Sequence, residues 1–84
     1  MEAVQVVLRS KDGCSLCQKA EAALARIGRD VALEVEIRKV PADDPDAERV
    51  PIVEIGGQEV QAGKVSEYRL RNWLKERGFL DAAR

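Results

Sequence analysis

Histidine is absent from this chain of 84 residues, and cysteine occurs only twice. The absence of histidine removes the side chain that most often binds metals and most often acts as a general base near neutral pH. Two cysteines are also too few for a small secreted scaffold, which usually carries four or more along its length. Because the two thiols are close in sequence, they indicate a reactive or metal-binding pair in a reducing compartment.

Charge of one sign and long hydrophobic runs are lacking as well. The 14 basic and 15 acidic residues give a net charge of −1, so no basic excess indicates nucleic-acid binding. No apolar run is long enough to span a membrane, and the N-terminus has no basic, apolar secretory signal. We therefore expect a cytoplasmic monomer that binds neither nucleic acid nor membrane, built as one globular domain over residues 1–84.

The pattern of apolar residues predicts six secondary-structure elements. They are expected at about residues 3–9 (strand), 15–28 (helix), 31–40 (strand), 50–55 (strand), 58–61 (strand) and from 64 or 65 to 77 (helix). The clean alternation of residues 33–38 predicts a strand with one wetter face, and Gly56-Gly57 predicts a tight hairpin. A strand–helix–strand unit implies a parallel pair with a right-handed crossover. The predicted fold is therefore α/β, a four-stranded mixed sheet in the order β-α-β-β-β-α, flanked by helices.

Cys14-Ser15-Leu16-Cys17 lies where the first loop becomes the first helix. Residues three apart at a helix start have Cβ atoms about 5–6 Å apart, close enough for a disulfide after a small adjustment. Unpaired N–H groups and the helix dipole favour the Cys14 thiolate, which is the nucleophilic form. Cys17 lies one turn further into the helix and should be more shielded. Cys14 is therefore the candidate attacking thiol and Cys17 the candidate resolving thiol.

Two other interpretations of the cysteine pair stay open. The thiols could be structural, because free cysteine is a common core residue. They could also form half of a metal site: zinc in structural sites takes four protein ligands, which this chain does not supply without histidine. A dimer or an external thiol would then have to complete the zinc or iron–sulfur site. The position of the pair at a strand-to-helix junction favours redox chemistry.

With this motif in place, the chain resembles the glutaredoxin branch of the thioredoxin superfamily over nearly its whole length. It is most similar to short bacterial glutaredoxin-like proteins, whose site often reads Cys-x-Leu-Cys. The resemblance implies a thioredoxin-like fold and a redox-active centre used in electron transport. It also implies that Pro51 is cis and lies beside the cysteines, and that the Val50 backbone pairs with substrate as an added strand does. The alternative for Pro51 is a plain proline at the start of a strand.

The resemblance implies three further substrate-binding residues. Lys11 stands three residues before Cys14, where glutaredoxins commonly carry a lysine for the glutathione carboxylate. Arg49 occupies the position of their usual threonine and could pair with an anionic ligand or be a solvated charge. Gly63 matches one glycine of their second Gly-Gly. The other glycine, the acidic pair after it and the aromatic residue near the cysteines are missing, so the match to glutathione is weaker than the match to dithiol chemistry.

The sequence thus predicts a thiol–disulfide oxidoreductase that reduces protein disulfides or glutathione mixed disulfides. Glutathione or a reductase would serve as the reductant, with glutathione as a co-substrate rather than a tightly bound cofactor, and no metal is expected. Two alternatives from other classes are a binding module of the same fold with weak or no turnover, and a metal or iron–sulfur carrier that uses Cys14.

Overall fold

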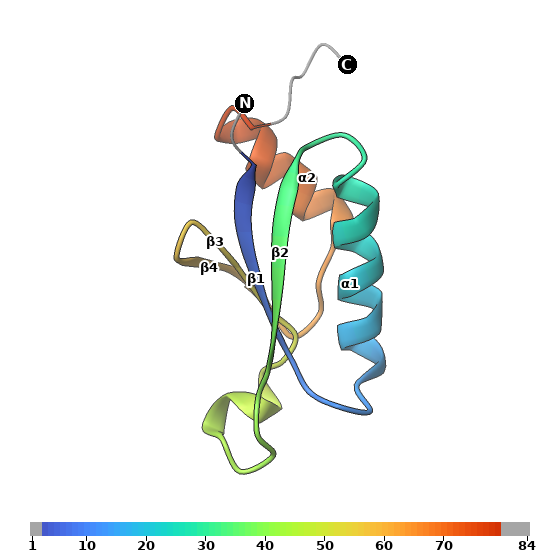
Figure 1. Ribbon diagram of the computed structural model, residues 1–84, viewed down its shortest axis with the longest axis vertical. Coiled ribbons are helices and arrows are strands. Elements are labelled where there is room, and N and C mark those ends of the chain that lie inside the picture. Colours follow the sequence, from blue (N-terminus) through green and yellow to red (C-terminus); the bar gives the residue numbers. More distant parts are fainter. Residues whose placement is uncertain (1–2, 80–84) are drawn as a thin grey trace.

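A computed structural model describes residues 3–79, so the outermost residues of the expected domain lie outside it. The elements are β1 (Val4–Ser10), α1 (Ser15–Ile27), β2 (Leu33–Lys39), the short 3₁₀ helix η1 (Pro45–Glu48), β3 (Ile52–Ile55), β4 (Gln58–Ala62) and α2 (Glu67–Glu76). The strands form one sheet in the order β2-β1-β3-β4 (Figure 1). β1 pairs with β2 in parallel, and the other pairs are antiparallel. The predicted α/β fold, consistent with a thioredoxin-like architecture, is confirmed.

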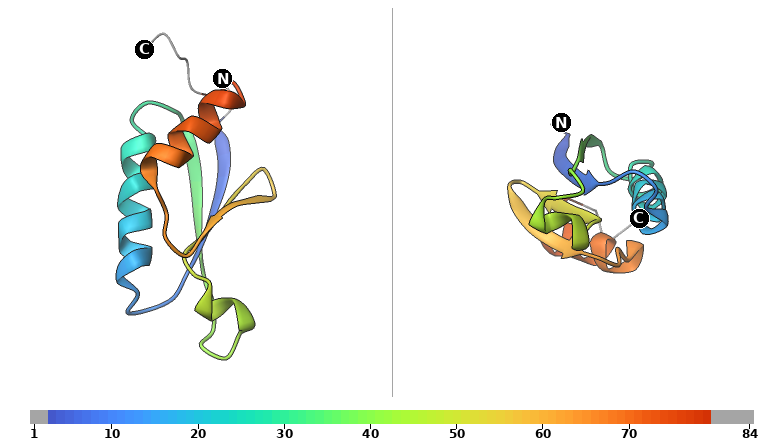
Figure 2. Two further views of the ribbon diagram at one scale, coloured as in Figure 1. Left: turned by 180° about the vertical axis from the view of Figure 1, so that it is seen from behind. Right: turned by 90° about the horizontal axis from the view of Figure 1, so that it is seen from below.

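Both α-helices pack on the same face of this sheet (Figure 2). The alternating residues Val4, Val6 and Leu8 of β1 point toward the helices and are buried. The apolar stripe of α1 and the pair Leu70 and Leu74 of α2 complete the core, with β3 contributing the residues opposite β1. The expectation of a sheet flanked by helices is thus refined: within residues 3–79 the second face has no α-helix on it.

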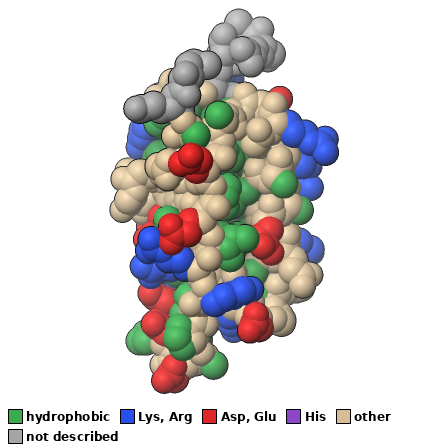
Figure 3. Space-filling model, viewed as in Figure 1, with side chains coloured by type: hydrophobic (Ala, Val, Ile, Leu, Met, Phe, Trp, Pro, Cys, Tyr) green, Lys and Arg blue, Asp and Glu red, His purple; other side chains and the backbone are tan. Residues whose placement is uncertain are grey.

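Strand β2 is shorter and wetter than its sequence suggests. It runs from Leu33 to Lys39, and Val35 and Ile37 are 41% and 44% exposed although they lie on the helix-facing side. β2 is the edge strand, and the core residues of the helices cluster over β1 and β3 instead. Figure 3, which looks at the molecule from the β2 side, shows hydrophobic side chains reaching the surface between charged ones. The alternation of apolar and polar residues in a strand therefore shows which side chains share a face. The position of the strand in the sheet decides how deeply that face is buried.

The connection from β2 to β3 contains only one helical turn, η1, and charged side chains tie it to the sheet. Asp44 caps η1 by accepting a hydrogen bond from the Asp46 N–H at 2.8 Å. The Asp46 carboxylate pairs with Arg9 of β1 at 2.9 Å and with Arg49 at 3.2 Å. Asp46 thus links β1 to Arg49, the residue immediately before Val50. Over residues 3–79, no helix combines the length and the apolar character needed to cross a membrane.

Candidate redox site

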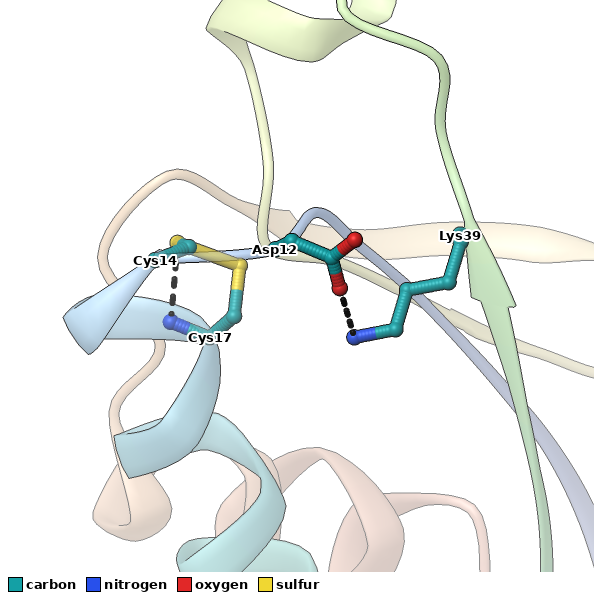
Figure 4. The surroundings of a disulfide bond; sticks show 4 residues. All are labelled: Asp12, Cys14, Cys17 and Lys39. Atoms are coloured by element: carbon teal, nitrogen blue, oxygen red, sulfur yellow. Dashed lines mark hydrogen bonds and ion pairs between the residues drawn. A yellow bond between two sulfur atoms is a disulfide. The ribbon is translucent and has the colours of Figure 1, made fainter.

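Cys14 and Cys17 form a disulfide at the start of α1, with their Cα atoms 5.2 Å apart (Figure 4). Cys14 is the N-cap of the helix: its backbone is extended, and its Sγ accepts a hydrogen bond from the Cys17 N–H at 3.1 Å. A sulfur thus occupies the place where an N-cap oxygen usually satisfies a free helical N–H. The first turn of α1 has no acidic residue. The donor and the helix dipole both favour negative charge on Cys14 Sγ once the disulfide is opened.

The two cysteines differ in accessibility. Cys14 is half-buried at the helix start, whereas Cys17 is 2% exposed and is the first buried residue of α1. Cys17 packs with Val50 and Ile52 in a small apolar cluster, and Cys14 and Val40 lie against its side. Cys14 is therefore partly accessible to solvent, while Cys17 is enclosed among apolar side chains.

The Val50–Pro51 peptide bond is cis, and Val50 belongs to the same buried apolar cluster as Cys17. Gly63 is hydrogen-bonded to this segment: its N–H donates to the carbonyl oxygens of both Arg49, at 2.9 Å, and Pro51, at 2.8 Å. Gly63 has a φ of +81°, a conformation that glycine adopts without steric cost. Within residues 3–79 the Val50 N–H and carbonyl have no backbone partner. The Val50 backbone groups are therefore unpaired at this point of the described chain, although the residue is only 6% exposed.

The two predicted basic residues lie outside this apolar cluster. Lys11 is exposed in the loop before Cys14. The Arg49 guanidinium is held by Glu59 at 2.6 Å and by Asp46 at 3.2 Å. The hydrogen bond that the Arg49 guanidinium donates to Glu59, followed by the one it donates to Asp46, raises the pKa of Arg49 above its ordinary value. Its charge is thus already matched by two carboxylates, which leaves it less able to bind an anionic ligand.

An ion pair stands beside the disulfide in Figure 4: Lys39 Nζ lies 3.4 Å from the Asp12 carboxylate. Asp12 belongs to the loop before Cys14, and Lys39 is the last residue of β2. Leu16, between the two cysteines, is 42% exposed. The rim of the site thus combines a neutralised charge pair with an accessible apolar side chain.

Sequence reasoning missed three residues of the site: Ser10, Val40 and Ile52. Val40 and Ile52 pack around Cys17, where only the tertiary fold brings the ends of β2 and β3 together. Ser10 is a buried polar residue at the end of β1. A signal for Ser10 was available, because it continues the alternation of Val4, Val6 and Leu8 on the helix-facing side of β1. Among the described residues, no three His, Cys, Asp or Glu side chains gather closely enough to hold a metal ion.

Comparison with known proteins gives one finding. A family model described as "Glutaredoxin-like domain (DUF836)" matches residues 5–75. This range begins in β1, includes both cysteines and the cis proline, and ends near the end of α2. No curated protein matches the chain.

Proposed function

This chain belongs to the glutaredoxin-like family, and we propose that it acts as a thiol–disulfide oxidoreductase through the Cys14/Cys17 couple. Its substrates are protein disulfides or glutathione mixed disulfides. The observation that carries the proposal is the asymmetry of the pair: a half-buried Cys14 that caps a helix with its sulfur, and a Cys17 that is almost fully enclosed. An accessible thiolate is the form that attacks disulfides.

The reaction follows from this asymmetry. The Cys14 thiolate attacks one sulfur of the substrate disulfide, so that a mixed disulfide forms, the substrate S–S bond breaks and the other substrate sulfur leaves as a thiolate. Cys17, after losing its proton to solvent, attacks Cys14 Sγ. The mixed disulfide then breaks and the second substrate sulfur also leaves as a thiolate. The two electrons that reduce the substrate come from the cysteine pair, which ends as the disulfide.

The Val50-Pro51 segment is the proposed substrate wall. Its unpaired Val50 N–H and carbonyl support recognition of an extended peptide by strand addition. Exposed Leu16 supports contact with apolar side chains of a polypeptide, and the double pairing of Arg49 favours a protein disulfide over free glutathione. Lys11 remains a candidate for a substrate carboxylate.

We place this chemistry in the cytoplasm, where thiols are kept reduced. An external thiol, either glutathione or the dithiol of a reductase, would return the Cys14–Cys17 disulfide to two thiols and would itself be oxidised. Glutathione then acts as a co-substrate.

Trapping experiments test the role of each cysteine. Cys17→Ser should accumulate a mixed disulfide on Cys14 when the protein is mixed with a disulfide substrate, because nothing resolves it. Cys14→Ser should trap little or nothing, because its remaining thiol is enclosed. Mass spectrometry under non-reducing conditions measures both, and Ser15→Ala, which keeps both thiols, is the matched control. Equal trapping by the two cysteine variants would contradict the assignment.

A further inference from the structure

Ser10 is a polar side chain placed where apolar ones are expected. It is 1% exposed, and its Oγ is the one buried side-chain nitrogen or oxygen atom within residues 3–79 that has no hydrogen-bond partner. Buried polar groups in native proteins are nearly always hydrogen-bonded, so an exception requires an explanation. The structure holds the cysteines as a disulfide, so it shows one redox state of the site.

The sheet places Ser10 on the side of the cysteines. Ser10 shares the helix-facing side of β1 with Leu8, whose partner on β3 is Val53. The paired register ends at Arg9 and Ile52, so Ser10 and the fully buried Pro51 are the next residue of each chain segment beyond the last pair. Ser10 and the cis proline are therefore both buried just beyond the paired part of β1 and β3.

Ser10 is also connected, through Val40, to the cluster that contains Cys17. The Ser10 carbonyl accepts a hydrogen bond from the Val40 N–H at 2.7 Å, and Val40 packs against the cluster that contains Cys17. Cys17 is the buried residue of α1 nearest to its N-terminus, and α1 follows Ser10 after a loop of only four residues, 11–14. Ser10 is thus joined to Val40, which packs against the cluster of Cys17, and both Ser10 and Cys17 are almost fully buried.

The redox state of the cysteine pair changes how strongly Cys17 Sγ can accept a hydrogen bond. In the disulfide, Cys17 Sγ is bonded to Cys14 Sγ and carries no charge, and the Ser10 hydroxyl has no partner within residues 3–79. After reduction Cys17 Sγ can become a thiolate, which is buried and needs a donor. We propose that the Ser10 hydroxyl donates a hydrogen bond to Cys17 Sγ in the reduced protein, and that Ser10 is thereby a positioning residue for the resolving thiolate. This inference rests on the proposed function, because it assigns a partner to the thiolate that resolves the mixed disulfide.

The charged groups around Cys17 do not supply such a donor from within the core. The cluster that encloses it is uncharged, with Val50, Ile52 and Val40. The titratable and charged side chains on the segments around the cluster are Cys14, the Asp12–Lys39 ion pair, exposed Lys11, Lys19 and Glu21, and Arg49 with its partners Asp46 and Glu59. These charges are at the exposed rim or are paired, so they change little when a buried hydroxyl is removed.

Titration of Cys17 alone tests the proposal. In a Cys14→Ser background only Cys17 forms a thiolate, which is followed by its ultraviolet absorbance as a function of pH. Adding Ser10→Ala should move the midpoint of thiolate formation up by about one pH unit, the shift expected for loss of about one hydrogen bond to a charged group. Ser10→Thr keeps the hydroxyl and should restore the midpoint. The proposal would be overturned if Cys17 had the same midpoint in the Cys14→Ser protein with Ser10 intact and in the one that also carries Ser10→Ala.

A second measurement uses the chain with both cysteines and separates the hydroxyl from a packing role. In glutathione redox buffers, Ser10→Ala should shift the equilibrium toward the disulfide by up to about tenfold at high pH, or about 30 mV for a two-electron couple. This difference between Ser10→Ala and the wild type should disappear at pH values below the midpoint of Cys17 thiolate formation. In the oxidised protein, Ser10→Ala should not lower the unfolding temperature, since the hydroxyl has no partner there. A pH-independent gap, or equal destabilisation of both redox states, would overturn the proposal.

The two proposals can fail separately. The Cys17 titration contains no substrate, so it reports on Ser10 whether or not the protein turns over. If the wild-type chain reduces disulfides but the Cys17 midpoint does not respond to Ser10→Ala, only the inference about Ser10 fails. If the midpoint shifts but the wild-type chain reduces no disulfide, only the proposed function fails.

Discussion

Strands β1 and β2 lie side by side in parallel register, and they carry the same kind of alternating sequence with opposite outcomes. Val6 pairs with Val35 and Leu8 with Ile37, all on the helix-facing side. The β1 members of these pairs are buried, while the β2 members are more than 40% exposed. The same contrast reaches the site, where buried and unpartnered Ser10 pairs in register with exposed Lys39.

The helix-facing side of the sheet is therefore buried over β1 and largely exposed over the edge strand β2. β1 has a strand on each side of it and both helices over its apolar residues, whereas β2 has a neighbour on one side only. The redox site lies beyond the carboxyl end of β1, one of the two inner strands of the sheet. Substituting registered pairs of residues measures how large the difference between the strands is.

The largest difference is expected for the pair Leu8 and Ile37. Leu8→Ala leaves a cavity in the centre of the core and should lower the free energy of unfolding by about 2–5 kcal/mol. Ile37→Ala, on the exposed edge, should cost less than about 1 kcal/mol. Chemical denaturation at fixed redox state measures both values. Equal losses at the two positions would mean that β2 is covered in solution.

A smaller difference is expected when a hydroxyl replaces a methyl group in the pair Val6 and Val35. Val6→Thr buries a hydroxyl among apolar side chains and should cost about 1–3 kcal/mol. Val35→Thr places the same group at a wet edge, in a residue type that strands favour, and should leave stability within about 0.5 kcal/mol. Thermal unfolding of the two variants, which have identical composition, makes the comparison. A large loss from Val35→Thr would contradict it.

The smallest difference is expected on the opposite face, where Arg9 pairs in register with Arg38. Arg9 joins β1 to the η1 connection through Asp46 at 2.9 Å, and its second partner, Glu54, lies at 3.6 Å. Arg9→Met should therefore cost about 0.5–1 kcal/mol, and added salt should reduce that cost. Arg38→Met removes an exposed pair with Glu36 on its own strand and should leave the unfolding midpoint unchanged. A salt-independent effect of Arg9→Met would indicate packing rather than charge.

Much of this molecule could be predicted from local sequence. The order of the elements, the mixed sheet and the place of the cysteines at a helix start all follow from short patterns, because strand alternation, helical stripes and turn glycines are local signals. Ser66 caps α2, as its position in the sequence suggests, by accepting from the Arg69 N–H at 3.3 Å. The predicted start of this helix at 64 or 65 was early, since α2 begins at Glu67.

The rest of the site depends on contacts between distant segments. The sequence left Arg49 as either an anion-binding residue or a solvated charge, and it could not show that the guanidinium pairs with Glu59 of β4 and Asp46 of η1. Val40 and Ile52 come from separate strand ends that meet only around Cys17. No local pattern encodes such contacts, because they depend on strand order and register.

The sequence by itself determined that two thiols stand three residues apart at the start of a helix. That spacing is enough for a disulfide and for a thiolate favoured by the helix end. Only the tertiary structure decided that Cys14 is half-buried and Cys17 enclosed, and that Val50 packs in the cluster of Cys17. It also decided that, within residues 3–79, the buried Ser10 hydroxyl has no hydrogen-bond partner. The physical reason is that accessibility and hydrogen bonding at a site depend on which strands cover it, and strand pairing is a long-range property of the chain.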